Sequence, residues 1–122
     1  MKKSIKIMLC LAVIGLASCS AKFPPPDSQV TMATSAISQA ESIGAYDAAP
    51  VELASAREKL NQARQAMRTG DNLLAQRWAD QATADANLAQ AKARTAKSLK
   101  SVAEFKEGLR ILQEEVDRAS AR

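Results

Sequence analysis

Apolar residues recur at steps of three and four along most of this chain, the spacing that places them on one face of an α-helix. A first helix is predicted over residues 30–45, where the stripe consists of Val30, Ala33, Ile37, Ala40 and Gly44. Pro50 suits a first helical position and Glu52 its first turn, so a second helix is expected to begin there and to end at Gly70. Its apolar stripe consists of Leu53, Ala56, Leu60, Ala63 and Met67.

Residues 69–71 predict a tight turn between the second helix and a third. Gly70 suits the left-handed position just past a helix end, and Asp71 can accept a backbone N–H bond at the start of the next helix. From Asn72 onward only Gly108 interrupts good helix formers, so the third helix could approach fifty residues, or roughly 75 Å. We therefore expect an all-α fold, an antiparallel helical hairpin or three-helix bundle with a long C-terminal helix.

The third helix carries two apolar stripes on different faces. The first is expected to face the second helix and consists of Leu74, Trp78, Ala82, Ala86, Ala89, Ala93 and Ala96. The second lies about 150° around the helix. It consists of Val102, Phe105, Leu109, Leu112 and Val116, continued by Ala119. Because the second helix is short, it can cover the third only to about residue 90.

The uncovered segment, residues 91–122, has two possible arrangements. It either continues as a helical arm whose apolar stripe meets another molecule, or it breaks near residues 97–101 and folds back. We favour the continuous arm because Lys and Leu do not break helices and Ser disfavours them only weakly. The basic residues of this region, Lys92, Arg94, Lys97 and Lys100, sweep a wide arc and are expected to form a solvated face.

The first eighteen residues have the pattern of a secretion signal. Three lysines precede an apolar run over residues 7–17, which is too short to span a membrane as a helix. The run ends in Leu16, Ala17, Ser18 and Cys19, which resembles the lipobox of bacterial lipoproteins. That resemblance implies cleavage before Cys19 and acylation of its sulfur. Ser20 in the position after the cysteine implies transport to the outer membrane of a Gram-negative cell.

Three prolines in a row, Pro24, Pro25 and Pro26, follow shortly after this cysteine. They favour an extended, semi-rigid segment over a helix. The chain is therefore expected to comprise a signal peptide over residues 1–18, a lipidated Pro-rich tether over residues 19–32 and an Ala-rich helical domain over residues 33–122.

Composition argues against an enzyme. The chain has no His, and Cys10 lies in the predicted signal, so the mature part keeps one cysteine and cannot form an internal disulfide or an ordinary zinc site. Without the signal lysines, 14 basic residues face 13 acidic ones, so the charge gives no indication of nucleic-acid binding. Aromatic residues make up only 3%, which predicts a thin core. We expect no metal and no cofactor apart from a covalent lipid on Cys19.

The pattern of the second and third helices resembles a known family. It consists of Pro50, Glu52, Leu53, Ala56, Arg57, Lys59, Leu60, Ala63 and Ala66, then Gly70 and Asp71, then Ala75, Ala79, Ala82, Ala84, Asp85, Leu88 and Ala89. These residues resemble domain of unknown function 4398, whose members are mostly short envelope lipoproteins with an Ala-rich helical hairpin. Some relatives add a peptidoglycan-binding domain, which we do not expect here. The chain also lacks the terminal lysine through which other Ala-rich lipoproteins attach to the cell wall, so no covalent peptidoglycan link is expected.

These features favour a lipid-anchored outer-membrane protein on the periplasmic side, with a structural or protein-interaction role. Its arm would associate with a second copy or with another envelope protein through the stripe from Val102 to Val116. An alternative is a small periplasmic module that holds a peptide or hydrophobic ligand between its helices. A cavity lined by Leu74, Trp78 and Tyr46 would favour that alternative, whereas Trp78 is more simply interpreted as a core residue.

Overall fold

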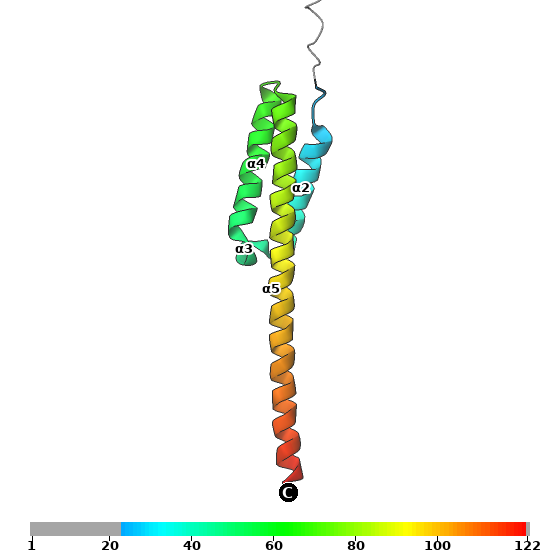
Figure 1. The fold of residues 1–122 in the computed structure, drawn as a ribbon, viewed down its shortest axis with the longest axis vertical. Helices are drawn as coiled ribbons and strands as arrows, with labels where there is room; N and C mark the ends of the chain where they lie inside the picture. The colour runs from blue at the N-terminus through cyan, green and yellow to red at the C-terminus, as the bar shows by residue number, and fades with distance from the viewer. Residues whose placement is uncertain (1–22, 122) are drawn as a thin grey trace, which may run out of the picture.

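The computed structural model describes residues 23–121, and all of its regular elements are α-helices. They are α2 (Asp27–Ser42), α3 (Ala45–Ala48), α4 (Pro50–Arg68) and α5 (Asn72–Ser120). α2 and α4 both pack along the first part of α5 and also contact each other (Figure 1). α4 runs antiparallel to α2 and to α5, so the three form an up-down-up bundle. The all-α fold with a long C-terminal helix is confirmed.

The first helix begins earlier than the sequence pattern predicted. α2 starts at Asp27 instead of Val30 and ends at Ser42 instead of Ala45, so the predicted tether is wrong for residues 27–32. Pro26 precedes the helix without interrupting it, because its carbonyl accepts the N–H of Val30 at 3.1 Å and its missing N–H is not needed there. The Asp27 carboxylate in the first turn also suits the positive end of the helix dipole.

The turn between α4 and α5 falls at the predicted residues. Gly70 adopts a φ of +79°, which lets the Asp71 N–H reach the Ala66 carbonyl at 3.0 Å. The Asp71 carboxylate then accepts the N–H of Leu74 at 3.0 Å and so caps α5. The chain therefore reverses over the three residues between the two helices, Thr69 to Asp71.

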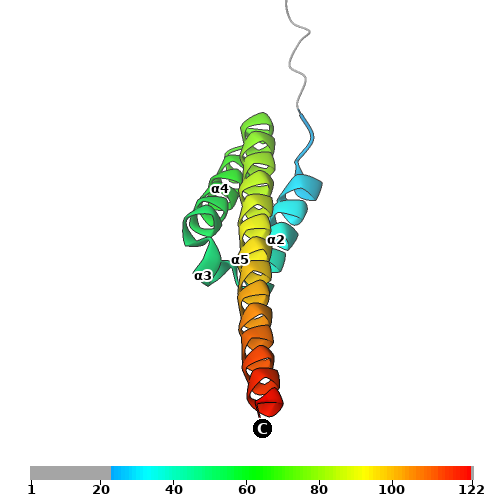
Figure 2. The same ribbon diagram turned by 60° about the horizontal axis from the view of Figure 1, so that its bottom comes forward.

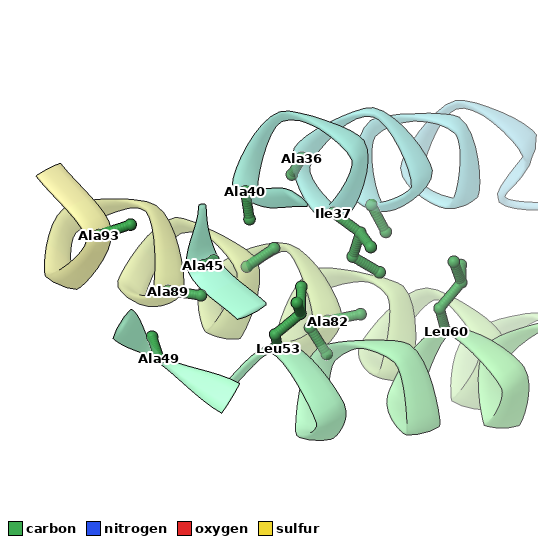
Figure 3. Close-up of a cluster of buried hydrophobic side chains, with 13 residues drawn as sticks. Ala36, Ile37, Ala40, Ala45, Ala49, Leu53, Leu60, Ala82, Ala89 and Ala93 are labelled. Carbon is green, nitrogen blue, oxygen red and sulfur yellow. The ribbon is translucent and has the colours of Figure 1, made fainter. Parts of the chain in front are cut away.

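The core is a seam of alanines with few large side chains, as the composition predicted. Among the described residues, Leu53 is the largest fully buried side chain, at 1% exposed. Ile37 and Leu60 accompany it, and the helices meet elsewhere through small side chains (Figure 3). The fully buried alanines are Ala33, Ala40, Ala45, Ala56, Ala63, Ala75, Ala79, Ala82, Ala86 and Ala89. Because alanine lets helices approach closely, the bundle is narrow and leaves no thick apolar interior.

The buried face of α5 differs from the predicted one. Ala75 and Ala79 are fully buried, whereas Leu74 is 41% exposed and Trp78 is only partly buried, so the assignment of Trp78 to the core is wrong. The prediction aligned α5 with α4 alone. In the structure α5 packs against both α4 and α2. The face of α5 that points toward this pair of helices carries Ala75 and Ala79 instead of Leu74 and Trp78. Ala96 was also placed on this face, and it is exposed.

Candidate functional site

α5 continues far beyond the bundle. Ala93 is its last buried residue, and every residue from 94 to 120 is exposed, so we call residues 94–120 the arm. At 1.5 Å per residue the arm is about 40 Å long. Figures 1 and 2 show it projecting clear of α2 and α4. The helix is unbroken through residues 97–101, so the continuous arrangement is confirmed and the folded-back one is wrong.

The arm carries a row of large exposed apolar side chains. The exposed fractions are 50% for Val102, 68% for Phe105, 51% for Leu109, 59% for Leu112 and 62% for Val116. Their alternating steps of three and four keep them on one face, which we call the apolar stripe. At 100° per residue the stripe is about 140° around α5 from the buried alanines, so it faces away from α2 and α4. The described chain therefore presents the stripe to solvent without covering any of it.

Ile111 is a large apolar residue of the arm that the predicted stripe does not include. Its side chain is 48% exposed, close to the 51% of Leu109. Two residues along a helix correspond to a rotation of about 200°, so Ile111 and Leu109 point to opposite sides of the arm. The two form a natural pair for comparing the stripe with the opposite face.

Charged residues on the other faces of the arm pair along the helix. Arg110 donates to Glu107 at 2.6 and 2.9 Å and also to Glu114. The hydrogen bond from Arg110 holds the pKa of Glu107 below its ordinary value. Lys100 lies 4.0 Å from Glu104, one turn away. Such exposed pairs add little stability. Their effect is to leave the polar faces of the arm balanced in charge, so the apolar stripe is its distinguishing feature.

A partly buried ion pair joins α4 to α5 within the bundle. Lys59 Nζ lies 2.6 Å from Asp85 Oδ2, and Ser55 Oγ donates to the same oxygen at 2.7 Å. Burial raises the pKa of Asp85, but the hydrogen bonds from Lys59 and Ser55 outweigh it and lower the pKa below its ordinary value of 3.8. The charged form of Asp85 is therefore favoured in the folded bundle.

A pH effect on stability follows from this pair. A carboxyl whose pKa is lowered on folding stabilises the fold above its ordinary pKa and loses that contribution as the pH falls through the lowered value. The Asp85→Asn variant should thus be less stable than the parent near neutrality. The difference between the two in free energy of unfolding, here called the gap, should narrow in acid. Urea unfolding at about pH 7 and about pH 3 measures this gap. Asp80→Asn, an exposed change on the same helix, should show a small gap at both pH values; an equal narrowing there would contradict the assignment to Asp85.

The structure does not bring Trp78 and Tyr46 together at one site where a ligand could bind. Tyr46 lies in α3, where its ring sits 4.8 Å from the Arg57 guanidinium and its hydroxyl accepts from the same group. Trp78 lies near the other end of the bundle and lines a shallow, open hollow with Leu74, Gln62 and Gln65. The predicted cavity lined by Leu74, Trp78 and Tyr46 is therefore absent from the described part of the chain.

The two ends of the described chain lie at opposite ends of the molecule. Asn72 Nδ2 donates to the Phe23 carbonyl at 2.6 Å, which holds the start of the described chain beside the turn between α4 and α5. The arm leaves the bundle at the far end, close to α3 (Figure 1). The predicted lipobox, Leu16 to Cys19, lies outside the described residues, four positions and more before Phe23.

Residues 23–121 contain no helix long and apolar enough to cross a membrane. Within the same range, no three potential metal-ligating side chains cluster together.

These features define a small Ala-rich helical bundle with one protruding helix. The family model of the domain of unknown function (DUF4398) matches residues 28–105, and the chain belongs to this family. No curated protein and no solved structure matches the chain. The family match ends within the apolar stripe, at Phe105, so Leu109, Leu112 and Val116 lie beyond it.

Proposed function

We propose that this protein is an outer-membrane lipoprotein with a non-catalytic, structural or protein-interaction role in the cell envelope. A lipid on Cys19 holds its N-terminal end at the membrane, and the arm binds a partner in the periplasm. The observation that carries this proposal is the apolar stripe, which lies on an uncovered helix at the end of the molecule opposite Phe23. A helix with such a face seldom stays unpartnered in water.

Support for the anchor comes from the lipobox pattern of residues 16–19 after a charged and then apolar leader. Two or three acyl chains on one cysteine bind a membrane stably, because each buried CH₂ contributes about 0.8 kcal/mol. Cys19 lies four positions before Phe23, a span of at most about 14 Å when the chain is fully extended. An anchored chain would therefore keep the turn between α4 and α5 close to the membrane surface.

Support for a reaching role comes from the length of α5. Its 49 residues extend about 73 Å from the turn to the C-terminal end. With the turn held near the membrane, the stripe would be presented well away from the lipid surface. The protein would thus connect the membrane to a partner at a distance, which requires neither a catalytic residue nor a cofactor beyond the lipid.

Photocrosslinking in intact cells tests whether the stripe binds a partner. A photoreactive residue in place of Leu109 should give a crosslinked product, because Leu109 is at the middle of the stripe. The same residue in place of Ile111 is the matched control, since it has similar exposure but faces the other side. No product from Leu109, or equal products from both positions, would refute a partner-binding stripe.

A further inference from the structure

We propose that the partner of the arm is a second copy of this chain, paired in parallel along the apolar stripe. This inference rests on the proposed function, in which both copies are anchored through Cys19. In this pair the stripe of one copy contacts the stripe of the other, and the two arms run in the same direction. The spacing of the stripe, the face it occupies, the charges beside it and the direction of the arm each support it.

The stripe has the spacing of a two-stranded coiled coil. In heptad notation the a positions are Val102, Leu109 and Val116, and the d positions are Phe105, Leu112 and Ala119. β-branched residues at a, with Leu at d, favour parallel dimers over higher assemblies. Val102, Val116 and Leu112 follow this rule, whereas Leu109, Phe105 and Ala119 do not. The same frame continues back toward the bundle, where Leu88 is at an a position and is 48% exposed. Exposed Ala84 and Ala91 are the nearby d positions, and the polar residues Thr95 and Ser98 occupy the a and d positions between them and the stripe.

The location of the stripe allows two copies to meet without collision. Because the stripe is about 140° from the buried alanine face, α2 and α4 lie on the far side of α5 from it. Two α5 helices can therefore pack back to back with both bundles outside. A stripe on the bundle side would have forced the two bundles into each other.

Charges flanking the stripe permit the parallel register. In a parallel pair, each g position faces the e position five residues on in the other copy. The facing pairs are Asn87 with Lys92, Arg94 with Leu99, Ser101 with Lys106, Gly108 with Gln113 and Glu115 with Ser120. None of these pairs brings like charges together. The register therefore carries no electrostatic penalty along five successive heptads.

The size of the stripe suits a pair of membrane-anchored copies. Its five large side chains expose half to two-thirds of their surface, on the order of 1,000 Å² for two copies, near the lower limit of specific interfaces. Two copies on one membrane share their orientation, since Phe23 is held at the turn and both arms point the same way. Confinement to one surface also raises the effective concentration of each copy for the other. Parallel pairing is the arrangement that this geometry favours.

Cysteine crosslinking in cells tests the pairing. Val102→Cys, Leu109→Cys and Val116→Cys are introduced singly into the full chain, oxidised and examined for disulfide-linked dimers. Each a position faces itself in the parallel pair, within the distance of about 7 Å between Cα atoms that a disulfide can bridge. All three variants should give the dimer. Ile111→Cys faces outward and should give several-fold less.

An antiparallel pair would instead bring Val102 of one copy to Ala119 of the other, so neither Val102→Cys nor Val116→Cys would link to itself. That result, or yields no higher than that of Ile111→Cys at every position, would overturn the parallel pair. The chain without an added cysteine should give no dimer because Cys19 is acylated. A dimer from that chain would instead contradict the lipid anchor, so the two proposals fail separately.

Discussion

Replacing Leu53 by alanine should destabilise the bundle by about 2–5 kcal/mol, the range measured for truncating a buried leucine. Leu53 is 1% exposed and packs where α2, α4 and α5 meet (Figure 3). Its loss leaves a cavity between helices that otherwise meet through alanines, and alanine side chains cannot move in to fill it. In a domain of this size each kcal/mol lowers the melting temperature by about 4–8 °C. Thermal unfolding followed by circular dichroism measures the shift.

Val51→Ala provides the control for this prediction. It also truncates an aliphatic side chain in α4, two residues from Leu53, but Val51 is 74% exposed. An exposed substitution of this kind changes stability by about 0.5 kcal/mol or less. Similar melting temperatures for the two variants would contradict the packing of three helices around Leu53.

Replacing Cys19 by serine should abolish attachment to the membrane. Serine lacks the sulfur that accepts diacylglycerol, so the chain would carry no acyl group. Under the proposed function this lipid is what holds the chain at the membrane. Labelling cells with radioactive palmitate and separating their membranes measures both the acylation and the location of the chain.

Cys10→Ser is the matched control, since this second cysteine lies in the apolar run of the predicted signal. The variant should incorporate palmitate and sediment with the membranes as the parent does. Label retained after Cys19→Ser, or lost after Cys10→Ser, would show that the lipobox has been assigned to the wrong cysteine.

Local patterns in the sequence predicted most of the fold. The apolar spacing identified α4 and α5, Pro50 marked the start of α4, and Gly70 with Asp71 marked the turn. These signals depend on nearby residues only, so they survive in the folded chain. The prolines were harder to interpret, because Pro26 is compatible both with an extended tether and with the start of a helix.

Features that depend on three helices together were not predictable from one helix at a time. The apolar pattern offered Leu74 and Trp78 for the face of α5 that meets α4, but the addition of α2 selected Ala75 and Ala79 instead. The ion pair between Lys59 and Asp85 likewise joins residues 26 positions apart. Nothing in the local sequence of α4 or α5 indicates that these two side chains meet.

The apolar stripe was predictable because it depends on a single helix. Its spacing identified the five residues, and the shortness of α4 indicated that they would stay uncovered. The direction of the arm was not predictable in the same way. It depends on the packing of α2 against α5, which brings the start of α2 to the end of the bundle where the turn lies and the stripe to the opposite end (Figure 1).

The separation of anchor and stripe can be measured by energy transfer on vesicles that contain acceptor-labelled lipid. The acylated protein is inserted with a fluorescent donor on Thr69→Cys, at the turn, or on Arg118→Cys, near the end of the arm. Strong transfer from residue 69 and weak transfer from residue 118 is the predicted result, because α5 extends about 73 Å from the turn. Equal transfer from the two positions would mean that the arm lies along the lipid surface, and would contradict a stripe presented to a partner away from the membrane.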